Sequence, residues 1–343
     1  MEALVYADPA LQARHVQPGH PERPERIRAC LEALETSRVK TQIIEPRGAS
    51  REDLERVHEP GYLDRLERLS QRGGGQVDPD TYVCPASFEV AVRAAGACCL
   101  AVEAALEDGQ RSFCLVRPPG HHASRKTAMG FCLVNHVAVG ARLALARGAG
   151  RVAVVDIDVH HGNGTQDIFW EDSRVLYLSL HQYPWYPGTG ALEETGAGPG
   201  AGTTVNIPLP AGAVDPVYLA ALTRVVDPAL RAFQPDLILV SAGFDAHARD
   251  PLALMEMSTE GYATMTSLLT ALSEEICGGR MVMTLEGGYD LKGLASSFVA
   301  SLQAMTGAVV KLPGGDPAPH ASAEAIERAV AFHGPIAEHL ACR

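Results

Sequence analysis

The residues of this chain best suited to chemistry gather in the segment 151–165, RVAVVDIDVHHGNGT. Its residues 152–155 are apolar and mostly β-branched, which predicts a strand covered on both faces. If that extended backbone continues, Asp156, Asp158 and His160 share one face of the strand. Such side chains are costly to desolvate together unless a divalent cation compensates their charge. The segment therefore predicts a metal site at a strand end.

Polar clusters also follow other apolar runs of the chain. In an open parallel sheet the ligand crevice lies outside the carboxyl ends of the strands, so clusters at several strand ends can meet in space. We therefore expect one shared site where these segments converge: PPGHH (118–122), DIDVHHGNG (156–164), SLHQY (179–183), SAGFDAH (241–247) and EGGYD (286–290).

Asp158, His160 and Asp245 form a candidate set of metal ligands, with Asp245 arriving from a later strand end. Two carboxylates and one imidazole leave positions on Zn²⁺ or Fe²⁺ open for water and a substrate oxygen. Such an open site is typical of catalytic metals, whereas structural zinc sites usually have four Cys or His ligands. A lone Asp-x-His would be explained equally well by a hydrogen-bonded core aspartate and a surface histidine.

His121 and His122 are adjacent, so they do not suit two equivalent positions on one metal. They fit better as acid and base groups beside a metal-bound water, tuned apart by different partners. Asp156 is a candidate to orient one of them and Asn163 the other. A solvated loop is the simpler interpretation of a lone His-His, but the flanking PPG at a strand end favours the functional one.

Three aromatic residues are candidates for the walls of the site. Tyr289 follows two glycines in EGGYD, and these allow a backbone path that aims the phenol into the crevice as an oxyanion donor. Phe131 and Tyr186 lie in glycine-flanked loops and could wall a narrow apolar channel. Packing in the core or under a turn is the alternative for each. The GNG at 162–164 has no phosphate-loop continuation, which argues against nucleotide binding.

The composition bounds the class of protein. The chain has 343 residues, 46% of them hydrophobic and 20% charged, as is ordinary for a soluble globular protein. Its formal net charge of −12 argues against nucleic-acid partners and against an anionic membrane surface. No apolar run is long enough to cross a bilayer, and the eight cysteines form no C-x-x-C pair. We expect a cytoplasmic protein with reduced cysteines.

Apolar runs alternate with helical patterns, which predicts a mostly parallel α/β sheet flanked by helices. We expect a single domain over 1–343, with a surface loop at 311–320 and a last helix near 322–332. The predicted strands are 3–7, 42–46, 112–116, 152–158, 175–180, 236–242 and 281–286. The predicted helices are 24–36, 51–69, 86–107, 135–147, 215–232, 260–276 and 291–306.

The chain resembles the metal-dependent deacetylases, which include histone deacetylases, acetylpolyamine amidohydrolases and bacterial acetoin-utilization-type deacetylases. The resemblance covers about residues 15–295, in the family order. It is carried by HPERPERI (20–27), RPPGHHA (117–123), MGFCLVN (129–135), DIDVHHGNGTQ (156–166), SLHQYPWYPGTG (179–190), SAGFDAHARDPL (241–252) and LEGGYDL (285–291).

The resemblance implies an arginase–deacetylase fold and a hydrolase that removes acetyl or other acyl groups from the ε-nitrogen of lysine. One catalytic zinc would lie on the three ligands already named, and its bound water would attack the acyl carbonyl. His122 would be the general base and acid, with His121 as its electrostatic partner. Tyr289 would polarise the carbonyl together with the metal.

The same resemblance implies further site residues. A structural K⁺ would lie beside the zinc on oxygens of Asp156, Asp158, His160, Ser179 and Leu180. Three other positions match the family pattern. Arg26 matches an arginine that lines an internal product channel, and Gly130 matches a residue whose backbone carbonyl meets the substrate. Asp80 matches, on a loose alignment, a rim aspartate that orients the substrate.

Two positions bear on specificity. Asn163 stands where some members have aspartate, as in class II-like relatives, so the partner of His122 would be neutral. Leu252 occupies a rim position where some polyamine-specific members carry glutamate, which favours acyl-lysine over acetylpolyamine. Tyr289 is present where a weakly active subgroup has histidine, which favours real activity. The substrate would be an acetylated lysine peptide or protein, with a small acetylated amine as the rival.

Two other functions are alternatives. A two-manganese ureohydrolase needs a further carboxylate, as in D-x-H-x-D, but Gly162 stands at that position. A catalytically silent acyl-lysine reader would be expected to lack Tyr289, a ligand or a histidine, and none is missing. The sequence leaves the physiological acyl group, the native metal and a homo-oligomeric state open.

Overall fold

A parallel sheet of eight strands forms the centre of the computed structural model, which describes residues 2–307 and 320–341. The strands lie in the order β2-β1-β5-β10-β9-β6-β7-β8, and each neighbouring pair is parallel. Their bounds are β1 Ala3–Tyr6, β2 Thr41–Ile44, β5 Ser112–Cys114, β6 Val152–Asp156, β7 Val175–Gln182, β8 Thr204–Leu209, β9 Leu237–Ala242 and β10 Met281–Leu285. A separate antiparallel hairpin pairs β3 (Gly75–Asp78) with β4 (Thr81–Val83).

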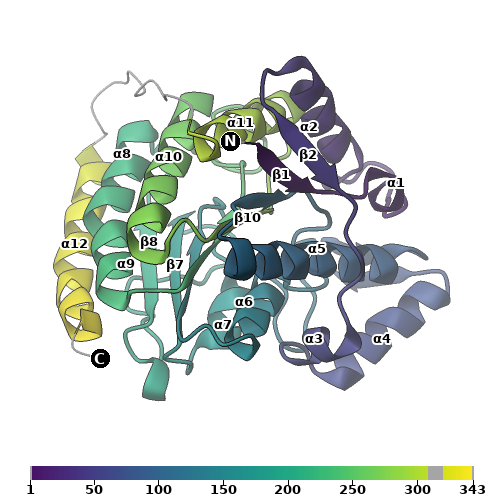
Figure 1. Ribbon diagram of the computed structural model, residues 1–343, viewed down its shortest axis with the longest axis horizontal. Coiled ribbons are helices and arrows are strands. Elements are labelled where there is room, and N and C mark those ends of the chain that lie inside the picture. Colours follow the sequence, from purple (N-terminus) through teal and green to yellow (C-terminus); the bar gives the residue numbers. More distant parts are fainter. Residues whose placement is uncertain (1, 308–319, 342–343) are drawn as a thin grey trace.

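Helices cover both faces of this sheet, as parallel strands require (Figure 1). On one face lie α5 (Ser87–Asp108) and α6 (His136–Ala146), with α3 (Arg51–Glu55), α4 (Pro60–Gln71) and α7 (Asn163–Phe169) beside them. The other face carries α2 (Glu25–Thr36), α8 (Asp215–Ala221), α9 (Asp227–Phe233), α10 (Thr259–Cys277), α11 (Leu291–Met305) and α12 (His320–Ala341). The short turns are α1 (Pro9–Gln12), the 3₁₀ turn Gly198–Gly200 and the π-helical turn Leu222–Val226.

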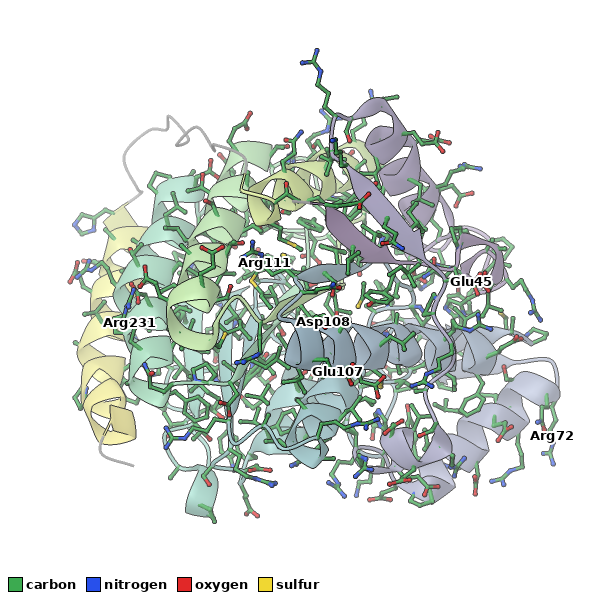
Figure 2. All side chains as sticks on the ribbon, in the orientation of Figure 1. Glu45, Arg72, Glu107, Asp108, Arg111 and Arg231 are labelled. Carbon is green, nitrogen blue, oxygen red and sulfur yellow. The ribbon has the colours of Figure 1, made fainter. Side chains whose placement is uncertain are left out.

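Two apolar cores lie on opposite sides of the sheet. Alternate strand residues feed each one: Val155 and Val240 pack on the side of α10, whereas Val154 and Leu239 pack on the side of α6. Of the charged residues labelled in Figure 2, Arg72 at the end of α4 and Arg231 on α9 lie on the outer surface. The central strands β5, β10, β9, β6 and β7 are buried throughout, whereas the edge strand β2 is partly exposed.

The central strands β5, β10, β9, β6 and β7 are contiguous, and all point the same way. These are the strands whose carboxyl ends carry the polar clusters, so the predicted convergence and the predicted fold class are confirmed. The expected helices and strands mostly occur, with boundaries shifted by one to three residues.

Two local predictions were wrong. The strand predicted at 152–158 ends at Asp156, so the period-two alternation does not extend to His160. The helix predicted at 51–69 is two helices, because Glu59 has an extended backbone and Pro60 begins the second helix. A residue before proline is disfavoured in the helical conformation, which breaks the pattern there.

The structure also adds elements that the sequence patterns did not predict, namely the edge strand β8, the helix α7 and the hairpin β3–β4. The last helix, α12, is longer than expected. The predicted surface loop 311–320 lies outside the described residues except for His320. None of the described helices combines the length and apolarity needed to cross a membrane.

Candidate active site

Asp158, His160 and Asp245 converge at the carboxyl end of the sheet, and their ligand atoms lie within 4.8 Å of one another. The Nδ1 atom of His160 is 3.2 Å from Oδ1 of Asp158 and 3.2 Å from Oδ2 of Asp245. Both carboxylates are fully buried. Buried carboxylates repel each other strongly unless a cation lies between them.

Backbone groups hold this cluster in place. Asp158 Oδ2 accepts a hydrogen bond from the N–H of Gly287 at 2.8 Å, and Asp245 Oδ1 accepts one from Val159 at 3.0 Å. Gly287 has to be glycine, because a Cβ there would lie 1.9 Å from Asp245 Oδ2. One oxygen of each carboxylate and one imidazole nitrogen therefore face a common point. Two carboxylates and an imidazole are a donor set that suits a divalent transition metal such as Zn²⁺ or Fe²⁺.

His121 is held by an ionic partner. Its Nδ1 lies 3.0 Å from Oδ2 of Asp156, which also accepts the hydroxyl of Tyr177 at 3.1 Å. Burial disfavours the charged imidazole, but the carboxylates of Asp156, Asp158 and Glu286 outweigh it and raise the pKa of His121 to about 10. Asp156 is thus the hydrogen-bond partner of His121, whereas Asp158, two residues later, belongs to the cluster of candidate metal ligands.

His122 is held by a neutral partner. Its Nδ1 is 2.8 Å from Oδ1 of Asn163, whose amide nitrogen faces the sulfur of Met129 at 3.3 Å. Because that amide oxygen can only accept, Nδ1 carries the proton and Nε2 keeps a free lone pair. Burial first, and then the neighbouring His121 and His160, hold the pKa of His122 well below its ordinary value. The two adjacent histidines are therefore tuned in opposite directions.

Tyr289 lies on the other side of the same pocket. Its ring meets Phe131 edge-on at 5.6 Å, and the guanidinium of Arg26 lies 4.9 Å from its centroid. Burial raises the pKa of Tyr289 well above that of an ordinary phenol, although Arg26 opposes this. The phenol is therefore protonated at neutral pH and able to donate a hydrogen bond.

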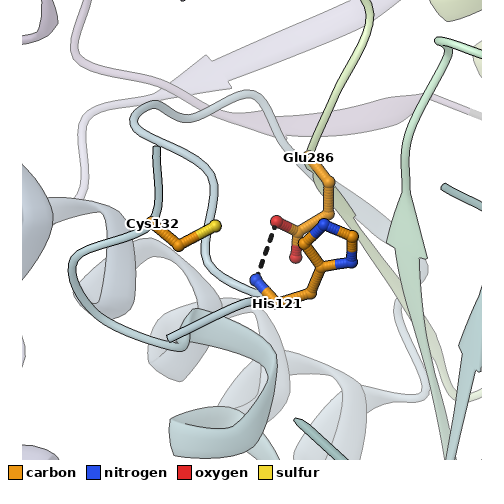
Figure 3. Close-up of side chains that lie close together, drawn as sticks. All are labelled: His121, Cys132 and Glu286. Carbon is orange, nitrogen blue, oxygen red and sulfur yellow. Dashed lines mark hydrogen bonds between the residues drawn. The ribbon is translucent and has the colours of Figure 1, made fainter. Parts of the chain in front are cut away.

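Glu286 is a site residue that the sequence analysis missed. Its Oε2 accepts a hydrogen bond from the N–H of His121 at 3.1 Å (Figure 3) and another from the N–H of Gly120 at 2.6 Å. Its Oε1 accepts one from Ser241. The side chains of His121, Cys132 and Glu286 lie close together, as metal ligands do. The hydrogen bonds of Glu286 show that its carboxylate holds the backbone at Gly120 and His121 and so positions the histidine pair. The sequence signal was present in EGGYD, which placed Glu286 at a strand end.

A pocket of about 260 Å³ leads from the surface to these groups and is lined by Asp80, Pro119, His121, His122, Gly130, Phe131, His160, Trp185, Tyr186, Leu252 and Tyr289. The ring of Tyr186 lies 5.2 Å from that of His122, across from Phe131. Gly130 has a φ of +55°, and a Cβ there would lie 2.3 Å from the ring of His122. Glycine is thus required at position 130, where the pocket wall packs against the ring of His122.

The mouth of this pocket is formed by loops. Asp80 and Leu252 both lie there, as the resemblance implied, and both are half-buried. Trp185, which the sequence analysis did not single out, is 37% exposed at the same opening. Its indole N–H donates to the carbonyl of Leu252 at 3.1 Å.

The residues expected to hold K⁺ are neighbours in the sheet. Asp156 on β6 pairs in register with Ser179 on β7, and Leu180 follows. Nε2 of His181 donates to the carbonyl of Gly190 at 2.9 Å, so its Nδ1 accepts the proton of Ser179 Oγ, also at 2.9 Å. The lone pairs of Ser179 Oγ are therefore left for another partner.

Arg26 is fully buried beneath Tyr289, where it donates to the carbonyls of Gly288 and Glu286. Its charge is matched by Glu22, which also receives two hydrogen bonds from Arg117, at 2.8 and 2.7 Å. Burial opposes the ionised form of Glu22, but Arg117, His15 and Arg26 lower its pKa to about 2. Sequence reasoning missed Glu22 and Arg117, because their role depends on contacts across distant segments.

Comparison with known proteins bears on this arrangement. A family model described as the histone deacetylase domain matches residues 20–305. The chain belongs to the histone deacetylase family. It is 41% identical over 286 residues to a "probable deacetylase" of Archaeoglobus fulgidus, covering 82% of this chain and 79% of that relative. It is also 42% identical over 276 residues to the "histone deacetylase-like amidohydrolase" of Pseudomonas aeruginosa, covering 79% and 73%.

A solved structure agrees. The crystal structure of the HDA15 HD domain superposes with a TM-score of 0.92 at 37% identity, over 100% of this chain and 98% of that one. The arginase–deacetylase fold of the chain is thereby established. As a member of this histone deacetylase family, the chain is a deacetylase, a hydrolase of amide bonds.

Proposed function

We propose that this deacetylase removes acetyl or other short acyl groups from the ε-nitrogen of lysine in peptides and proteins. The observation that carries the proposal is the convergence of the Asp158, His160 and Asp245 cluster with two oppositely tuned histidines at the end of one narrow pocket. The pocket is walled by the rings of Phe131 and Tyr186. Such walls suit an extended aliphatic stem, which gains stability by leaving water.

The metal in our proposal is Zn²⁺, held by Asp158, His160 and Asp245, with Fe²⁺ as a chemically similar alternative. When bound, it would supply Lewis-acid activation of a water molecule and of the acyl carbonyl. The unsatisfied negative charge of two buried carboxylates supports a divalent ion at this point.

The histidine pair then handles the protons. Nε2 of His122 carries a free lone pair, so it takes a proton from the attacking water and delivers it to the leaving amine. His121, charged and fixed by Asp156, keeps His122 neutral before the reaction. Asn163 holds the reactive tautomer of His122 without adding a charge.

Tyr289 stabilises the oxygen of the acyl group. Its protonated hydroxyl donates to that oxygen as negative charge develops, which is the task of an oxyanion donor. We propose in addition that the carbonyl of Gly130 accepts the amide N–H of the substrate, and that Arg26 borders the route by which acetate leaves. The position of Arg26 directly under the Tyr289 ring supports this route.

Two further features belong to the proposal. A structural K⁺ would lie on oxygens of Asp156, Asp158, His160, Ser179 and Leu180, and the free lone pairs of Ser179 support it. The seven described cysteines are all unpaired, which supports a reducing compartment such as the cytoplasm.

Deacetylation of acetylpolyamines is the second candidate function, with the same chemistry. The carboxylate of Asp80 at the mouth favours it, because it could hold a second ammonium group. The apolar side chain of Leu252 at the same mouth favours the lysine substrate instead. Asp80 would in that case orient the backbone of the acylated peptide.

The test is the release of acetate by zinc-loaded protein from an acetyl-lysine peptide and from N-acetylputrescine, with Tyr289→Phe as the control. We expect the peptide to be preferred, and its hydrolysis to fall by about 10²–10³-fold in the variant, as for loss of an oxyanion donor. A preference for N-acetylputrescine would establish the second candidate. Hydrolysis of neither substrate would contradict both.

A further inference from the structure

A single carboxylate connects the mouth of the pocket to the candidate catalytic tyrosine. Asp250 Oδ2 accepts the N–H of Tyr289 at 2.6 Å and that of Asp290 at 3.2 Å, while its Oδ1 accepts the N–H of Leu252 at 3.0 Å. The side chain is buried, with only 9% exposed. Both oxygens are thus used on backbone groups of two different loops.

The hydrogen bonds continue outward from Leu252. Its carbonyl accepts the indole N–H of Trp185, and the N–H of Leu254 donates to the side-chain oxygen of Gln182 at 2.9 Å. Gln182 is the last residue of β7, and Trp185 lies in the segment that follows it. The rim loop 250–254 is therefore fixed at one end to that segment and at the other to Tyr289.

The inner end of this connection is held on the side of the metal cluster by two other hydrogen bonds, from the N–H of Gly287 to Asp158 and from Arg26 to the carbonyl of Gly288. The two residues before Tyr289 are glycines, and Gly288 has a φ of +115°, a conformation that fixes neither neighbour through side-chain packing. On the far side, Asp290 caps α11 through the N–H of Gly293. Among these contacts, the hydrogen bond to Asp250 is the one that joins the backbone at Tyr289 to the rim loop.

The outer end offers a surface to the substrate. The partly exposed indole of Trp185 and the side chain of Leu252 flank the opening, with the carboxylate of Asp80 on the same pocket. An indole face attracts apolar groups and cations alike. A peptide whose acylated lysine enters the pocket brings its flanking residues against this indole, whereas N-acetylputrescine has no flanking residues to place there.

We propose that Asp250 is a positioning residue that sets Tyr289 relative to the mouth, and that Trp185 contacts the residues flanking the acylated lysine. The inference rests on the proposed function, because it takes Tyr289 as the group that meets the acyl oxygen. Asp250 touches neither substrate nor metal ligands in this role; it acts through the backbone of Tyr289 and Leu252.

The test of Asp250 is a double-mutant cycle with Asp250→Asn and Tyr289→Phe. An amide has only one accepting oxygen, so it cannot receive both loops, and its N–H₂ opposes a backbone N–H. We expect kcat on both the peptide and N-acetylputrescine to fall about 10-fold, with KM changed less than about twofold. In the Tyr289→Phe background the same substitution should cost less than about twofold.

Asp290→Asn is the matched control, because asparagine keeps the helix cap and this side chain contacts neither Leu252 nor Tyr289 N–H. Zinc content should be the same in all of these variants, and each should remain folded at the assay temperature in a thermal melt. An unchanged kcat in Asp250→Asn would overturn the proposal, and so would an equal loss in both backgrounds.

A measurement that does not depend on enzyme activity, hydrogen exchange, separates this proposal from the proposed function. In Asp250→Asn, hydrogen exchange of the backbone amide of Tyr289 should become at least about 10-fold faster than in the wild type, because its acceptor is lost. If the wild type hydrolyses neither substrate, the proposed function fails, and this exchange rate alone decides the positioning role. An unchanged rate would overturn it.

Trp185→Phe tests the mouth, since it keeps an aromatic ring and removes the indole N–H and part of the contact face. KM for the acetyl-lysine peptide should rise about threefold to fivefold, or roughly 1 kcal/mol, with kcat and the kinetics on N-acetylputrescine unchanged. An equal change for both substrates, or none for the peptide, would contradict the contact.

Discussion

The floor and the mouth of the pocket are built from different parts of the fold. At the floor, Asp158 and Asp245 are fully buried at strand ends and receive hydrogen bonds from the backbone. At the mouth, Trp185 is 37% exposed and Leu252 is half-buried, and both lie on loops. The floor thus inherits the rigidity of the sheet, whereas the mouth depends on a few hydrogen bonds between loops.

This difference assigns separate tasks to the two regions. Groups that must be placed to a fraction of an ångström, such as the histidine pair and the ligand cluster, are fixed by the sheet and by Glu286. Groups that choose between substrates lie where substitution costs the fold little. Changes at the floor should therefore reduce the chemical step or the stability, and changes at the mouth should alter KM and preference.

The largest loss is expected for His122→Ala at the floor. His121 cannot take over as a base, because the neighbouring carboxylates raise its pKa to about 10 and keep it protonated. Removing the general base should lower kcat by about 10²–10⁴-fold with little change in KM. Steady-state acetate release, together with an unchanged melting temperature, checks this. A kcat within about 10-fold of the wild type would show that another group moves the proton.

The next largest effect is on stability, at the buried ion cluster below the floor. Glu22→Gln leaves Arg117 and Arg26 without their carboxylate and should lower the free energy of unfolding at pH 7 by about 3–5 kcal/mol. Glu25→Gln, a partly exposed residue at the start of α2, should cost less than about 1 kcal/mol. Urea denaturation of both variants measures the contrast.

The pH dependence of that stability has a defined sign. Because the folded protein lowers the pKa of Glu22 from 4.5 to about 2, the ionised carboxylate stabilises the fold above pH 4.5. That contribution, about 3 kcal/mol, should disappear as the pH falls from 4.5 toward 2. The difference between wild type and Glu22→Gln should shrink over this range. A difference independent of pH would contradict the assignment.

Gly130→Ala tests the wall between floor and mouth. The added Cβ would lie 2.3 Å from the ring of His122 and displace it, so kcat should fall by about 100-fold. Gly148→Ala is the matched control, since Gly148 also has a positive φ, of +100°, but nothing lies within 4 Å of its Cβ. Equal activity losses in the two variants would refute the steric argument.

The smallest effect is expected at the mouth itself. Leu252→Glu should favour N-acetylputrescine over the acetyl-lysine peptide by up to about fivefold in kcat/KM, because an exposed ion pair contributes at most about 1 kcal/mol. Leu252→Gln has the same shape without the charge and should leave the ratio near that of the wild type. The main-chain links of Leu252 to Asp250 and Trp185 remain in both. A ratio unmoved by the charge would exclude Leu252 from specificity.

The sequence predicted the floor far better than the mouth. Strand ends are marked by an apolar run followed by polar residues, so the positions of His122, Asp158 and Asp245 at one edge of the sheet followed from local pattern and parallel topology. Glu286 and Asp250 stayed hidden because their oxygens accept backbone N–H groups, which leave no trace in residue type. The break at Pro60 was missed because the apolar periodicity resumes after it.

The edge strand β8 was missed for a related reason. Its sequence TVNIPL interrupts the apolar run with Asn206 and Pro208, which lowers the strand signal. Proline is tolerated there because β8 pairs with β7 alone and is not a central strand. Apolar sequence patterns thus identify the central strands of a sheet, whereas its edge strands are recognised only in the tertiary structure.

The most direct test of the central claim is a zinc titration of metal-free protein. Acetate release from the acetyl-lysine peptide should be absent at the start and should rise to a plateau at one equivalent of bound Zn²⁺. Asp245→Asn, which keeps the size of the side chain and removes one negative ligand, should bind zinc weakly and show no such rise. Full activity in the metal-free protein, or in Asp245→Asn without zinc, would contradict a metal-dependent deacetylase at this site.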